Sequence, residues 1–68
     1  MKNNKLLYNA LKAKSEAQKA EALATLDVYF TNAVGIGEHP QIVEEMGKQL
    51  EVLANAEDCL SSLKKNFS

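Results

Sequence analysis

The sequence predicts an all-α protein: a hairpin of two long antiparallel helices, which dimerises into a four-helix bundle. Three observations lead to this prediction. Good helix formers fill the stretch from Asn4 to Ala33, which contains neither glycine nor proline. A second stretch, from Pro40 to Lys65, repeats apolar residues at helical spacing. The short segment between them contains two glycines, which indicates a turn that folds the helices back on each other.

The first predicted helix spans about residues 4–33 and changes character along its length. A stripe of mostly small residues repeats every three or four positions on one face, which permits the close approach of another backbone. The stripe consists of Leu6, Ala10, Ala13, Ala17, Ala20 and Ala24. Toward the end of this helix, Leu23, Leu26 and Phe30 widen the apolar surface. We therefore expect the thickest part of the core near that end.

The predicted turn covers about residues 34–39 and is followed by a proline. One glycine is placed just past the end of the first helix, where the backbone often takes a positive φ. Pro40 suits the first position of a helix because it lacks an N–H group. The apolar side chains of Val34 and Ile36 either fold back over the helix ends or, together with His39, form a docking tip for a partner. Folding back is the favoured interpretation.

The second predicted helix spans about residues 40–65. Lys64 and Lys65 lie near its end, where the helix macrodipole favours positive charge. Its apolar residues share one face at heptad spacing. They are Val43, Met46, Leu50, Leu53, Leu60 and Phe67, with Ile42, Ala56 and Leu63 broadening the face and Glu57 interrupting it. Folding at the turn places residue i roughly beside residue 73 − i.

The predicted hairpin is too thin to bury a sufficient core by itself. The chain has 68 residues, of which 46% are apolar, and we expect a single domain covering residues 1–68. Ordering one residue costs about 1.5 kcal/mol, so folding needs on the order of 4,000 Å² of buried apolar surface. We expect a second copy to supply what two helices lack. The residues predicted to mediate self-association are Leu23, Leu26, Phe30, Met46, Leu50, Leu53 and Leu60.

Charge is distributed unevenly between the two halves of the chain. Residues 1–37 carry five lysines and three acidic residues, whereas residues 38–68 carry three lysines and six acidic residues. The hairpin is therefore basic at its open end and acidic at its turn. This asymmetry favours the hypothesis of a homodimer whose hairpins run in opposite directions, although exposed ion pairs add only about 0–1 kcal/mol each.

Catalytic, metal and cofactor sites have little support in the sequence. The two glycines before Pro40 lack the third glycine of a dinucleotide-binding loop and the Lys and Ser/Thr of a P-loop. A metal site or a catalytic dyad needs several converging donors, and the chain has one histidine, His39, and one cysteine, Cys59. We expect a non-enzymatic protein without a metal or cofactor, and we interpret Cys59 as a half-buried structural thiol.

The lysines of the first helix support an alternative function, a helical dimer that binds nucleic acid. The candidate contacts to phosphates are Lys5, Lys12, Lys14 and Lys19. The chain has no arginine, and Tyr8 is the only aromatic ring near these lysines. A solvated lysine face is therefore favoured over a nucleic-acid interface.

The sequence indicates a cytoplasmic protein. Its first residues lead into a stretch rich in alanine and lysine, without the apolar core of a signal peptide. No apolar run approaches the roughly 18 residues that a membrane-spanning helix needs. One cysteine excludes a disulfide within the chain. We expect no membrane partner.

The segment around the turn resembles a group of phage proteins. The run Asn32-Ala33-Val34-Gly35-Ile36-Gly37-Glu38-His39-Pro40, with the helix after it, resembles small uncharacterised helical proteins of large tailed bacteriophages, especially marine ones. The resemblance covers about half of the chain. It implies a phage or environmental origin, with the host cytoplasm as the compartment, and it assigns no functional residue. The sequence therefore predicts a structural or protein-interaction module whose specific role is open.

Overall fold

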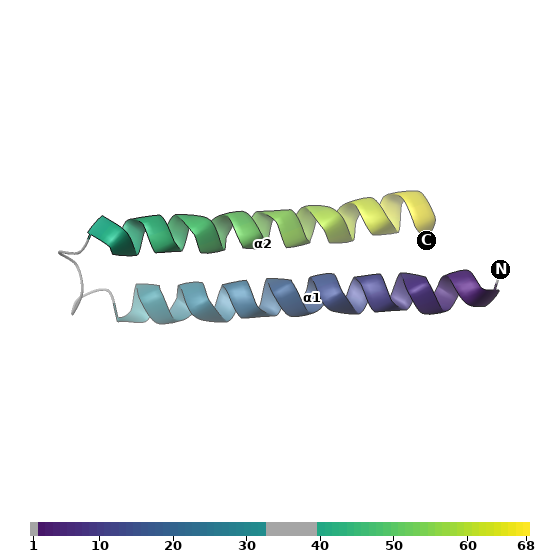
Figure 1. Ribbon diagram of the computed structural model, residues 1–68, viewed down its shortest axis with the longest axis horizontal. Coiled ribbons are helices and arrows are strands. Elements are labelled where there is room, and N and C mark those ends of the chain that lie inside the picture. Colours follow the sequence, from purple (N-terminus) through teal and green to yellow (C-terminus); the bar gives the residue numbers. More distant parts are fainter. Residues whose placement is uncertain (1, 33–39) are drawn as a thin grey trace.

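The computed structural model describes residues 2–32 and 40–68, which form two helices. Helix α1 spans Lys2–Thr31, and helix α2 spans Pro40–Phe67. The helices run antiparallel, side by side, and contact each other extensively (Figure 1). The predicted all-α helical hairpin is therefore confirmed. The predicted turn, including Val34, Ile36 and His39, lies outside the described residues.

Hydrogen bonds from backbone and side-chain groups occupy carbonyls near the C-terminal ends of both helices. The Asn32 N–H group donates to the Val28 carbonyl over 3.0 Å, which continues the hydrogen-bonding pattern of α1 past Thr31. In the last turn of α2, the Asn66 side-chain amide donates to the Ser62 carbonyl over 2.8 Å. Such bonds occupy carbonyls close to a helix end, where partners within the helix run out. They help α2 to continue to Phe67, past the predicted end at residue 65.

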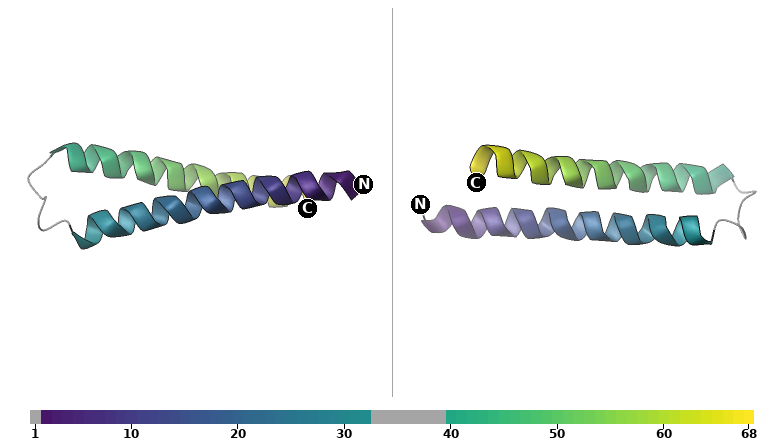
Figure 2. Two further views of the ribbon diagram at one scale, coloured as in Figure 1. Left: turned by 60° about the horizontal axis from the view of Figure 1, so that its bottom comes forward. Right: turned by 180° about the vertical axis from the view of Figure 1, so that it is seen from behind.

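The hairpin is a thin rod with little interior. Its principal extents are 54 × 15 × 13 Å, and its radius of gyration is 15.6 Å. A compact domain of this length has a radius of gyration of about 11 Å. The accessible surface is 5656 Å², whereas a folded monomer of this mass exposes about 4,250 Å². The views in Figure 2 show the same two-helix rod from two other directions, with no further layer on either side of it. Two helices alone therefore leave an unusually large share of the chain in contact with solvent.

A seam of less exposed residues runs between the helices. On α2 the seam residues are spaced alternately by four and three positions. They are Ile42, Met46, Gln49, Leu53, Ala56, Leu60 and Leu63. On α1 the seam consists of Tyr8, Ser15, Lys19, Ala22, Thr25, Leu26 and Tyr29. Among the described residues, Ala22, Leu26 and Ala56 are buried. The seam has the heptad spacing of an antiparallel coiled-coil pair.

The small-residue stripe predicted for α1 does not face α2. Its members, Leu6, Ala10, Ala13, Ala17, Ala20 and Ala24, are all exposed. The spacing of the alanines alone does not determine which face of α1 packs against α2. Tyr8, Leu26 and Tyr29 occupy the seam instead. Larger side chains remove more apolar area from water when they cover the leucines of α2.

The packing face of α2 differs in part from the predicted one. Met46, Leu53 and Leu60 lie in the seam as expected, together with Ile42, Ala56 and Leu63. In contrast, Val43, Leu50 and Phe67 are exposed. Val43 and Leu50 each follow a seam residue by one position, and a step of about 100° along a helix turns them to the side of the seam.

The contacts between the helices lie close to the predicted register. The Lys19 Nζ atom lies 4.0 Å from the Glu57 Oε2 atom, and one groove near the turn is lined by both Leu26 and Leu50. These residues are within three positions of the pairs that the predicted rule gives, residue i beside residue 73 − i.

Candidate self-association surface

An open apolar groove lies between the helices near the turn. Its volume is about 280 Å³. The residues that line it are Leu26, Phe30, Val43, Met46, Gly47 and Leu50. All of them are apolar, and we call this surface the turn-end groove. Phe30 and Val43 at its rim are 69% and 71% exposed, so the hairpin itself does not cover them.

The helical repeat explains how the rim of this groove forms. Leu23 and Phe30 are seven residues apart on α1, and each follows a seam residue by one position. Val43 and Leu50 have the same relation to the seam of α2. In an antiparallel pair, positions that follow the seam by one residue lie on the same side of both helices. Exposed apolar side chains of α1 and α2 are therefore brought together on one face of the rod.

Gly47 forms a hollow in the wall of the turn-end groove. A Cβ atom built at Gly47 meets no heavy atom within 4 Å, so contact with α1 does not require a glycine here. A glycine in a helix interior destabilises the helix by about 1 kcal/mol relative to alanine. Among the described residues, no contact at Gly47 offsets this cost. The missing side chain instead leaves space that opens to the outside of the molecule.

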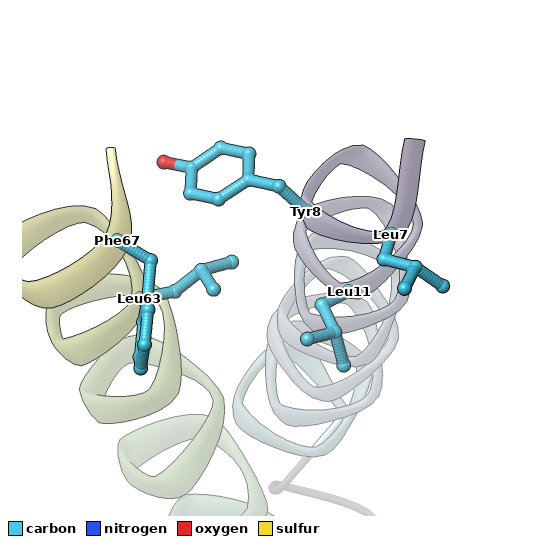
Figure 3. Close-up of a pocket in the computed structure, with 5 residues that line it drawn as sticks. All are labelled: Leu7, Tyr8, Leu11, Leu63 and Phe67. Atoms are coloured by element: carbon cyan, nitrogen blue, oxygen red, sulfur yellow. The ribbon is translucent and has the colours of Figure 1, made fainter. Parts of the chain in front are cut away.

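Two adjoining apolar grooves lie at the open end of the rod. The larger, of about 360 Å³, is lined by Leu7, Tyr8, Leu11, Leu63 and Phe67. Figure 3 shows the Tyr8 ring reaching from α1 toward α2, above Leu63. The adjoining groove shares three of these residues and adds Ser15, Cys59 and Ser62. The Cys59 thiol is free and exposed, which corrects the expectation of a half-buried thiol.

Charged residues separate the turn-end groove from the open end on the same side of the seam. The Lys19–Glu57 pair lies midway along the rod, with side chains 41% and 52% exposed. Because solvent screens such a pair, it contributes at most about 1 kcal/mol. Beyond it, a groove of about 270 Å³ is lined by Tyr8, Lys12, Glu16, Leu60, Leu63, Lys64 and Ser68. One face of the rod is thus apolar near the turn and charged near the open end.

The residues predicted to mediate self-association fall into two groups. Leu26 is buried between the helices, and Met46, Leu53 and Leu60 are half-buried in the seam. Leu23, Phe30 and Leu50 remain exposed on the side of the turn-end groove. Sequence reasoning did not include Gly47 or the leucines of the open end in this surface. The spacing of Leu7 and Leu11, one helical turn apart, was the available signal for the open end.

The four lysines expected to contact phosphates in the nucleic-acid alternative do not all lie on one face of α1. Lys5 and Lys12 are exposed and follow the same seven-residue spacing as Lys19, whose amine pairs with Glu57. Lys14 is exposed two positions after Lys12, which turns it about 200° around the helix axis. Three of the four lysines therefore form a line along the rod, and Lys14 points elsewhere.

The described residues contain neither a cluster of metal-ligating side chains nor a membrane-spanning helix. Within residues 2–32 and 40–68, no group of three or more His, Cys, Asp or Glu side chains is placed to hold a metal ion. Neither α1 nor α2 is long and apolar enough to cross a membrane. Comparison with known proteins gave no match to a family model, a curated protein or a solved structure. The case for a function therefore rests on the surface of the hairpin.

Proposed function

We propose that this protein is a non-enzymatic structural or protein-interaction module that works as a self-associating helical hairpin. The observation that carries the proposal is the amount of apolar surface that the hairpin leaves uncovered. Side chains such as Leu23, Phe30 and Leu50 are about half exposed or more, at positions where a helical bundle buries apolar groups. Exposed apolar patches of this kind mark interaction sites or aggregation risks.

A second copy is the partner that this surface fits best. One face of the rod is 54 Å long and 15 Å wide, an outline large enough to supply the roughly 800 Å² of accessible surface that one partner contributes to a standard interface. Pairing two such faces gives four helices around a shared core. The buried side chains of the isolated hairpin are mainly the small residues Ala22 and Ala56 with Leu26, so the gain in burial would be large.

The solution mass tests this proposal most directly. Light scattering across a hundredfold dilution, with helicity followed by circular dichroism on the same samples, should give a dimer that remains helical. Replacing Leu50 with Asp should produce a monomer, because the charge would have to be desolvated in the bundle core. Leu6→Asp is the matched control, since Leu6 is 73% exposed and lines none of the grooves described above. A wild-type chain that stays monomeric and fully helical at all concentrations would rule out the proposal.

A nucleic-acid-binding helical dimer is a second candidate, supported by the line of lysines. Lys12 and Lys64 line one groove at the open end. Lys5 and Lys19 lie seven residues before and after Lys12. Glu16 in the same groove opposes phosphate binding. Titration of RNA and DNA at several salt concentrations separates the candidates. A steep log–log slope that flattens in Lys5→Gln/Lys12→Gln would support nucleic-acid binding, and no binding at low salt would eliminate it.

A further inference from the structure

We infer that the two hairpins pair with their turns at the same end of the bundle, and that Phe30 of each copy packs into the hollow at the partner's Gly47. The inference rests on the proposed self-association and specifies its geometry. It concerns the turn-end groove, where a protruding aromatic ring and a missing side chain occur on one surface. A surface with both features can complement a second copy of itself across a twofold axis.

Phe30 is the protruding element. Its side chain is 69% exposed, although it lies at the wall of an apolar groove. A phenylalanine with this exposure leaves on the order of 100–150 Å² in contact with water. Aromatic rings of this kind are typical anchors of protein interfaces when a partner provides a pocket. Among the described residues, the groove that Phe30 lines leaves most of this side chain exposed.

Gly47 provides the hollow. It lies in the interior of α2, where glycine weakens a helix, and no atom of its own hairpin needs the space that a side chain would take. A glycine at this position lets another molecule approach the α2 backbone closely. Its neighbours in the groove, Val43 and Leu50, form apolar walls on either side along the helix. An aromatic ring placed there would be enclosed by apolar groups.

The register of the hairpin determines which orientation brings these two elements together. Phe30, Met46 and Gly47 line the same groove, so Phe30 of α1 lies near the level of Gly47 of α2. When two hairpins face each other and point the same way, α1 of one copy lies over α2 of the other at the same level. Phe30 then faces the partner's Gly47, and the partner's Phe30 faces Gly47.

The opposite orientation does not produce this contact. When two hairpins face each other and point opposite ways, α1 lies over the partner's α1, so Phe30 cannot reach the partner's Gly47. With full overlap, the turn-end groove also meets the charged groove of Lys12, Glu16 and Lys64. That contact would desolvate charges against apolar groups, whereas same-direction pairing places the charged groove of each copy against the charged groove of the other. The apolar surface therefore favours the same-direction pair over the opposite-direction pair suggested by the charge asymmetry.

A double-mutant cycle in the full chain tests the predicted contact. Phe30→Ala removes the ring, and Gly47→Leu fills the hollow, so each should weaken self-association at least tenfold, measured by sedimentation equilibrium. The double variant should associate at least tenfold more tightly than the product of the two single effects predicts, because Leu at position 47 occupies the space left by Phe30. Lys48→Leu is the matched control beside Gly47, and its effect should stay within threefold. Circular dichroism on each variant verifies that the helices are retained.

The orientation has an independent test with spin labels on a Cys59→Ser background. Labels at Lys5→Cys and, separately, at Gln41→Cys report the two ends of the rod. Same-direction pairing should give distances within the bundle width for both labels, about 30 Å or less. Opposite-direction pairing with full overlap would give about 40 Å or more for both, from a rise of 1.5 Å per residue.

The outcomes separate the inference from the proposed function. A wild-type dimer with long label distances, or with additive effects in the mutant cycle, would overturn the inference and leave self-association intact. A wild-type chain that does not associate would overturn both. Short distances at both ends together with compensation in the double variant would establish the geometry.

Discussion

The two helices contribute side chains of different polarity to the same seam. The seam of α2 is apolar at nearly every position, with Leu53 and Leu60 in its central part, and Gln49 is its one polar member. The seam of α1 contains Ser15 and Lys19 beside Ala22 and Leu26. Helix α2 therefore supplies most of the apolar surface that drives packing. Helix α1 presents the face that covers this surface best, which is not the face with the most regular pattern of its own.

This difference predicts that Leu26 is the most sensitive position of α1. Leu26 is 7% exposed and is the only large apolar side chain in the buried class of the described residues. Leu26→Asp should abolish cooperative unfolding, because a buried, unpaired carboxylate costs several kcal/mol in a protein with few buried groups. Thermal unfolding followed by circular dichroism measures the effect. A Leu26→Asp chain with an unchanged melting curve would show that α1 packs through another face.

Two substitutions in the middle of the seam compare what α1 and α2 contribute to the free energy of unfolding. Leu53→Ala on α2 should lower the free energy of unfolding by about 2 kcal/mol, the low end for leucine truncation because Leu53 is only half-buried. Ser15→Ala on α1 should change it by less than about 0.5 kcal/mol. Chemical denaturation at one fixed protein concentration gives both values, since association couples stability to concentration. Equal losses at the two positions would contradict an apolar seam dominated by α2.

The smallest effect is expected on the outer alanine stripe of α1. Ala13→Gln and Ala17→Gln should each change the free energy of unfolding by less than about 0.5 kcal/mol, because both residues are exposed and glutamine is a good helix former. If this stripe were a close-packed contact, each larger side chain would cost about 1–3 kcal/mol. The sedimentation coefficient of the same variants would show whether the stripe takes part in assembly.

The hairpin could be predicted from sequence because its signals are local. Helix formers without glycine or proline indicate α1, heptad spacing indicates α2, and Pro40 marks where the second helix begins. The packed face of α1 could not be predicted in the same way. Leu26 and Phe30 are both apolar and lie one helical turn apart, yet one is buried and the other exposed. Only the position of α2 distinguishes them.

The candidate self-association surface could be predicted only in part, because it also depends on how α1 and α2 pack. Phe30 and Leu50 were expected in an interface from their size and apolar character, and they remain uncovered in the hairpin. Gly47 carries no side chain, so its place in the groove becomes visible only when α1 and α2 are packed together. The hypothesis that the two hairpins run in opposite directions was based on the net charges of residues 1–37 and 38–68. Those net charges do not show which charged residues share a face with the turn-end groove.

The distance along the chain between contacting residues also influences the order in which the contacts of the hairpin form. Near the turn, Phe30 and Met46 are separated by 16 positions along the chain, whereas Tyr8 and Phe67 at the open end are separated by 59. Closing the longer loop first costs about 1 kcal/mol more chain entropy than closing the shorter one. Folding should therefore start beside the turn and proceed toward the termini, and unfolding should start with fraying of the open end. The turn-end groove is then assembled early, when a folding chain first meets a second one.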